Sequence, residues 1–157
     1  MLALVALGGC GDGTDPAEEG ANRTALAEWS SRAEDLCEQN ATRAERSVLR
    51  LTREARAEHM SKREYAARVL ELSARQASPA LDRLEAIPPP RGHEQQVDDF
   101  IMRLRKSLVS FRRSADALRT HDNQAAGAAN REILQQAVPA RALARELNIE
   151  ACIPSGS

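Results

Sequence analysis

The chain has 157 residues, which is enough for one domain with a real hydrophobic core. Charged residues make up 29% of it and the formal net charge is −1, so no bulk field favours nucleic acid or an anionic membrane. Aromatic residues make up only 3%, so the core has to be built from Leu, Val, Ile and Ala, which favours packed helices over strands.

The first ten residues predict an export signal. An apolar run over 1–7 leads into Gly8, Gly9 and Cys10, the order found at the end of a bacterial lipoprotein signal peptide. In this interpretation the small residues would admit the peptidase, and the sulfur of Cys10 would then carry the lipid. No Lys or Arg precedes Cys10, so we expect the true translation start to lie upstream of Met1. The alternative is a chance apolar terminus with a free Cys10 thiol.

This signal divides the chain into three parts. Residues 1–9 are expected to be the end of the signal peptide, and residues 10–23 the lipidated cysteine with a flexible polar tether. The folded domain is expected over residues 24–153.

Two helices are expected in the first half of the domain. From Thr24 to Ala57 the apolar positions recur with a mean step of about 3.6 residues, the α-helical period. A second helix is expected to start at a Ser61 cap and to end before Pro88. Within it, Ser78-Pro79 predicts either a kink or a new helix start.

Two more helices are expected in the second half. Apolar residues spaced alternately four and three apart predict a helix from about Glu94 to Arg119. After a turn at 121–123, a fourth helix should run to Leu147 with a kink at Pro139, and Asn148 should take the left-handed position that closes it. No stretch alternates with period two. We therefore predict an all-α domain, an antiparallel up-down-up-down four-helix bundle.

Large apolar side chains are expected in the core of this bundle. Trp29 should pack on Ile87 and the prolines at 88–90, because the second helix ends near the level of Trp29. Met60, Met102 and the remaining aromatic residues are also assigned to core packing.

A disulfide bond is expected between Cys37 and Cys152. These two cysteines remain once Cys10 is set aside, an even pair in an exported protein. In the bundle the fourth helix should run back alongside the first, and at 1.5 Å per residue it ends slightly past the level of Cys37. Residues 149–152 can then turn back to Cys37. The alternative is two buried free thiols.

Three short segments carry a family resemblance. They are Ala33-Glu34-Asp35-Leu36-Cys37 with Asn40, Leu84-Glu85-Ala86-Ile87-Pro88-Pro89, and Leu147-Asn148-Ile149-Glu150-Ala151-Cys152. In that order they resemble the small helical lipoproteins of high-G+C bacteria, over about residues 30–153. Most of those proteins have no assigned function, so the resemblance implies no catalytic residue.

The motifs of common enzymes and metalloproteins are missing from the sequence. There is no Gly-rich phosphate loop and no HExxH pair. His59, His93 and His121 fall at three different helix connections, and the bundle topology excludes a site made from all three. The paired carboxylates Asp98-Asp99 and Glu18-Glu19 fit solvated positions better than an acid–base site. A basic streak on the third helix fits a solvated face better than a nucleic-acid site; it consists of Arg103-Arg105-Lys106 and Arg112-Arg113. We expect no catalytic residue, metal or cofactor.

Two classes of function stay open. The preferred one is a non-enzymatic lipoprotein, anchored to the outer face of a bacterial membrane, whose bundle surface binds another envelope protein or the cell wall. The alternative is a small-ligand carrier or sensor with a pocket between helices bent at Pro79 and Pro139. An apolar cavity would favour the carrier, and a solid core with an exposed apolar patch would favour the binding protein.

Overall fold

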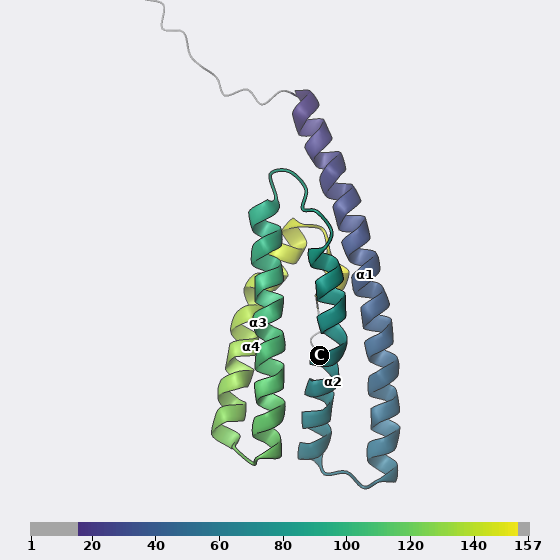
Figure 1. The fold of residues 1–157 in the computed structure, drawn as a ribbon, viewed down its shortest axis with the longest axis vertical. Coiled ribbons are helices and arrows are strands. Elements are labelled where there is room, and N and C mark those ends of the chain that lie inside the picture. The colour runs from purple at the N-terminus through teal and green to yellow at the C-terminus, as the bar shows by residue number, and fades with distance from the viewer. Residues whose placement is uncertain (1–15, 154–157) are drawn as a thin grey trace, which may run out of the picture.

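The computed structural model describes residues 16–153, and within this range the chain is entirely helical (Figure 1). The elements are α1 (Pro16–Ala57), α2 (Lys62–Glu85), α3 (Glu94–Arg119), α4 (Asn123–Glu146) and the 3₁₀ helix η1 (Glu150–Cys152). Consecutive helices pack antiparallel, so the predicted all-α, up-down-up-down four-helix bundle is confirmed.

The helix α1 begins eight residues before the expected start at Thr24. Pro16 stands at its first position and Glu18 and Glu19 lie in its first turn, residues that suit a helix N-terminus and its dipole. Residues 16–23, expected as part of a flexible tether, are therefore helical. The first two turns project beyond the rest of the bundle (Figure 1), and most side chains from 17 to 24 are exposed.

Three of the helices end in the same way. The second residue after each helix has a positive φ, 50° at His59, 61° at His121 and 52° at Asn148. The N–H of the following residue then donates to a carbonyl one turn back, which satisfies an otherwise free acceptor. These bonds are Met60 N to Ala55 O at 2.9 Å, Asp122 N to Ala117 O at 2.9 Å, and Ile149 N to Ala144 O at 2.8 Å. The left-handed conformation predicted for Asn148 is confirmed.

The helix starts also follow local signals. Ser61 caps α2 by accepting from Glu64 N at 3.2 Å, and Asp122 caps α4 by accepting from Ala125 N at 2.9 Å. The helix α2 runs on through Pro79, and the Ser78 hydroxyl donates to Ala74 O at 3.0 Å within it. Ser78-Pro79 therefore does not start a new helix.

The best-packed part of the core lies at the end that carries the loop between α2 and α3. Trp29 is 3% exposed there, and Ile87 packs against the cluster to which Trp29 belongs; the expected packing of Trp29 on the prolines at 88–90 stays a prediction. Phe100 is 1% exposed although it falls outside the four-three apolar pattern of α3. Towards the opposite end the buried residues are mostly small, and they include Ala67, Ala117, Ala126 and Ala129. Small side chains let paired helices approach closely but fill little space between all four.

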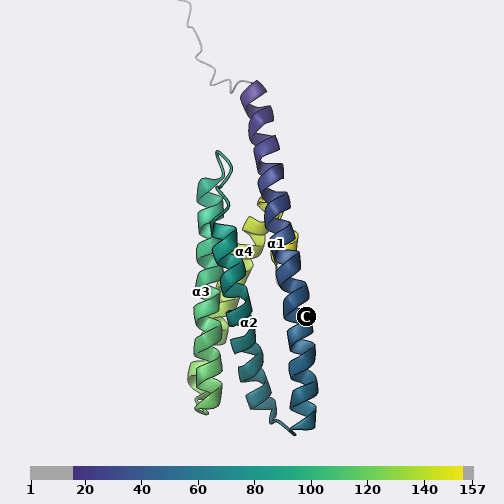
Figure 2. The same ribbon diagram turned by 45° about the vertical axis from the view of Figure 1, so that its right-hand side comes forward.

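The bundle is open between its first and last helices. All Cα atoms of α1 stay more than 8 Å from those of α4 within the described range. Figures 1 and 2 show α2 and α3 between them at the end with the α1–α2 turn. The expectation that α4 runs alongside α1 is therefore wrong for most of its length. The two are connected where α4 ends, because η1 contacts both α1 and α4 and Ser30 of α1 contacts the carbonyl of Leu147, the residue after α4.

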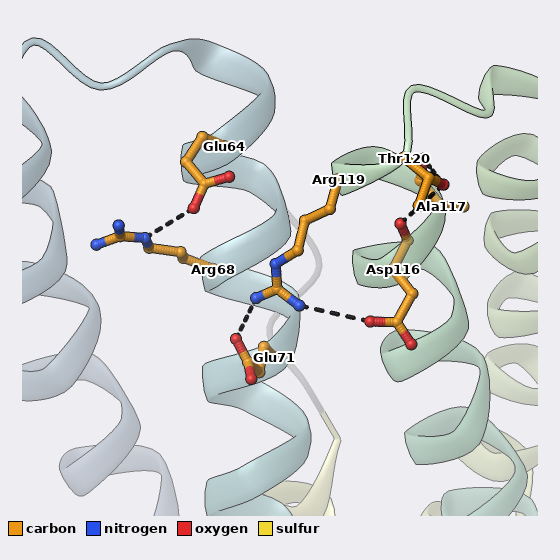
Figure 3. Close-up of polar contacts among 7 residues, drawn as sticks. All are labelled: Glu64, Arg68, Glu71, Asp116, Ala117, Arg119 and Thr120. Carbon is orange, nitrogen blue, oxygen red and sulfur yellow. Dashed lines mark hydrogen bonds and ion pairs between the residues drawn. The ribbon is translucent and has the colours of Figure 1, made fainter.

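Ion pairs connect α2 to α3 along their length. Arg119 of α3 lies between Glu71 of α2 and Asp116 of its own helix (Figure 3), and the Asp116 pair measures 3.4 Å. Arg105 pairs in the same way with Asp82, at 3.1 Å, and Glu85. These arginines are exposed to solvent, so the pairs contribute little to the stability of the bundle.

Candidate functional site

The predicted disulfide bond is present and joins α1 to η1. Cys37 and Cys152 form a disulfide with an S–S distance of 1.95 Å and a Cα–Cα distance of 4.9 Å. Cys10, the expected lipidation site, lies outside the described residues. The two bridged cysteines meet because η1 crosses to α1 after α4 has ended, and not because the two long helices are neighbours.

Polar contacts surround the disulfide and hold the same segment. The backbone N–H of Ala151 donates to Glu34 Oε1 at 3.0 Å. Ser30 Oγ is 2.6 Å from Leu147 O and 2.7 Å from Leu26 O, so its single hydrogen can serve either carbonyl. Ser30 is buried, and the contact with Leu147 therefore satisfies a polar group at the centre of the junction between α1 and the end of α4. We call this junction the clasp.

A shallow groove of about 730 Å³ runs along the outer side of α3. Met102 and Val109 are among its lining residues, and they are 39% and 52% exposed. Met102 had been assigned to the core, and that assignment is wrong, because its position on α3 faces away from the other helices. We call this groove the α3 face; its charged and apolar lining includes Asp98, Met102, Arg105, Lys106, Val109 and Arg113, with Glu85 and Glu132 at its edges.

Charges at the edges of the α3 face are paired. Arg113 lies 2.9 Å from Glu132 Oε2, an oxygen that also accepts from Ser110 at 2.9 Å. The hydrogen bonds that Arg105 donates, to Glu85 first and then to Asp82, raise the pKa of Arg105 above its usual value. The lining holds three acidic side chains, Glu85, Asp98 and Glu132, against three basic ones, Arg105, Lys106 and Arg113. A balanced surface with apolar residues between the charges suits contact with another protein better than with a polyanion.

The basic streak expected on one solvated face of α3 is distributed over several sides of the helix. Arg112 donates to Ser78 of α2 at 2.8 Å, while Arg103 lies against α4 and donates to Gln136 at 3.4 Å. Arg105 and Arg113 lie on the α3 face between them. These side chains are therefore mostly engaged in helix–helix contacts.

The three histidines lie at three different helix connections, as expected from the bundle topology. His59 and His121 lie at the two turns at one end of the bundle, and His93 precedes α3 at the other. In residues 16–153 no group of three His, Cys, Asp or Glu side chains could hold a metal ion. The helices of this range also contain no stretch that is both long enough and apolar enough to cross a membrane.

Comparison with protein-family models, curated proteins and solved structures found no match to this chain. The candidate site therefore rests on the geometry of the clasp and of the α3 face.

Proposed function

We propose that this protein is an exported, non-enzymatic lipoprotein of the bacterial cell envelope that binds a protein partner through the α3 face. The proposed anchor is a lipid on Cys10, which would place the domain on the outer side of a membrane. We also propose that the three short segments that resemble small helical lipoproteins of high-G+C bacteria reflect membership of that group.

The disulfide between Cys37 and Cys152 is the observation that carries the proposal. Cytosolic thiols are kept reduced, whereas proteins outside the cytosol retain such bonds. An exported location also accounts for the apolar run and small residues that precede Cys10 in the sequence.

The projecting part of α1 supports a position near a membrane. Only residues 11–15 separate Cys10 from Pro16, where α1 begins. A lipid on Cys10 would therefore hold the start of α1 close to the membrane surface. The exposed turns that follow would act as a stalk carrying the bundle outward (Figure 1).

The form of the surface supports partner binding over ligand transport. A carrier needs a concave, largely apolar cavity that encloses most of its ligand. The α3 face is instead an open groove with exposed Met102 and Val109 between charged residues. Apolar side chains bordered by charge are typical of protein-binding surfaces.

Replacement of Cys10 with serine tests the proposed anchor. When the protein is expressed from its own gene, we expect it to be labelled by radioactive palmitate and to partition into the detergent phase. Cys10→Ser should abolish both, because the sulfur is the atom that carries the lipid. Equal labelling of the mutant would contradict lipidation at Cys10.

A charge placed on the α3 face tests the proposed binding surface. Crosslinking in intact membranes, followed by pull-down, should identify a partner protein. Val109→Glu should lower the amount of this partner that is captured at least tenfold, because a buried unpaired carboxylate disfavours the complex. Leu134→Glu is the matched control, since Leu134 is 66% exposed on α4 and does not line the groove. Equal capture by both variants and the wild type would exclude the α3 face as the binding surface.

A further inference from the structure

The turn between α1 and α2 forms a second hollow with an unusual charge distribution. It has a volume of about 480 Å³ and lies at the end of the bundle opposite the start of α1. Three of its lining residues are basic, namely Arg56, His59 and Lys62, and no carboxylate lines it. In a chain whose net charge is −1, this is a local separation of charge.

The basic side chains of this hollow are not neutralised by neighbours. In residues 16–153 no ion pair or side-chain hydrogen bond involves Arg56, His59 or Lys62. Elsewhere in the bundle Arg105, for example, is held between two carboxylates. Within the described residues the hollow therefore presents basic side chains without ion-pair partners, whereas Arg105 and Arg113 on the α3 face are paired with carboxylates.

The nearby carboxylates act on another residue. Glu64 Oε1 pairs with Arg68 at 2.9 Å (Figure 3), and this hydrogen bond is the main reason that the pKa of Arg68 is raised. Glu58 and Glu54 add to the same effect on Arg68. These three carboxylates thus lie close to Arg68, and none of them lines the hollow.

The other polar groups of the hollow have their hydrogens in use. The Thr52 hydroxyl donates to Val48 O at 2.9 Å, so the 2.9 Å contact between Thr52 and Tyr65 is donated by the Tyr65 hydroxyl. Met60, Ala55 and the Tyr65 ring supply an apolar wall. The hollow can therefore select a ligand by negative charge, with Arg56 and Lys62 as the main donors.

Two features next to the hollow also favour an anion. The N-terminus of α2 adds the positive end of its dipole. Arg63 Nη1 is buried without a hydrogen-bond partner, which leaves a second guanidinium only partly compensated beside the turn.

We infer that this hollow binds an oxyanion of the phosphate class through Arg56, His59 and Lys62. The α1 helix is about 63 Å long at 1.5 Å per residue, so the site lies far from Pro16 and from any anchor before it. The inference is consequently independent of the proposed lipidation. The oxyanion can belong to a free phosphate compound or to a lipid headgroup of another surface, and both share the same chemistry.

NMR titration of the full chain with inorganic phosphate tests the site. Sodium chloride at equal ionic strength serves as the reference, because exposed charges are screened by salt. We expect saturable shifts of the ring signals of His59 and of Tyr65, the only tyrosine, with a dissociation constant on the order of 1 mM. The signals of His93 and His121 should stay unchanged. Arg56→Gln and Lys62→Gln should each weaken binding by up to about fivefold, and the double variant should abolish it.

Arg53→Gln is the matched control, because Arg53 is an exposed arginine of the same helix that does not line the hollow. It should bind phosphate as the wild type does, and unchanged Trp29 fluorescence should show that all variants fold. Co-sedimentation with phosphatidylglycerol vesicles that depends on Arg56 and Lys62 would assign the oxyanion to a lipid headgroup. If the protein binds phosphate but does not co-sediment with the vesicles, the oxyanion would belong to a soluble compound. Failure of both probes, or equal binding by the double variant, would overturn the inference.

Discussion

Replacing Trp29 with alanine is expected to lower the free energy of unfolding by about 3–5 kcal/mol. Trp29 is 3% exposed and belongs to the cluster that joins α1 to the other helices at the best-packed end of the bundle. Its removal would leave a large cavity beside Ala33 and Leu147, which are themselves fully buried. Urea unfolding followed by circular dichroism measures the change.

Two further variants separate packing from other effects. Trp29→Phe should cost much less than Trp29→Ala, because Trp29 Nε1 is buried without a hydrogen-bond partner and phenylalanine removes that unsatisfied donor. Leu134→Ala, at a side chain that is 66% exposed, should change stability by less than about 0.5 kcal/mol. If Trp29→Ala were as mild as Leu134→Ala, the described core would be wrong.

Removing the disulfide with Cys37→Ser and Cys152→Ser should destabilise the domain by about 2–5 kcal/mol. The bond spans 115 residues, so in the chain-entropy model it restricts the unfolded chain by about 5 kcal/mol, which is an upper figure. Denaturant unfolding of the double variant measures the loss.

Hydrogen exchange should show where that loss begins. Apart from the disulfide, α1 meets the end of the chain through contacts with η1, the Ser30–Leu147 contact and the Ala151–Glu34 hydrogen bond. Amides after Pro139 should therefore exchange faster in the double variant, while amides in the middle of α3, packed on both α2 and α4, should keep their protection. A uniform loss of protection would contradict the claim that the clasp stabilises the end of the chain locally.

Local signals predicted much of the fold. The limits of α3 at Glu94 and Arg119, the cap at Ser61, the turn at 121–123 and the left-handed Asn148 depend on neighbouring residues and were all visible in the sequence. By contrast, the start of α1 at Pro16 was missed, because the polar residues and Gly20 of this segment also fit a tether.

Features set by tertiary packing were harder to predict. The gap between α1 and α4 arises because buried alanines bring neighbouring helices together without filling a shared centre, and helix periodicity carries no information on that distance. The α3 face was not predicted, because Met102 and Val109 are of residue types that usually lie in a hydrophobic core. The pairing of Cys37 with Cys152 was predicted correctly, although η1 and not α4 reaches across to α1.

The number of free thiols in the mature protein tests the central claim most directly. The claim is that the protein is exported from the cytosol and that its mature form carries a lipid on Cys10 and a disulfide between Cys37 and Cys152. Protein purified from membranes without reductant should be denatured and titrated with a thiol reagent. We predict no reactive thiol per chain, and two after reduction. Two reactive thiols before reduction would contradict the disulfide, and a single one would contradict the lipidated Cys10.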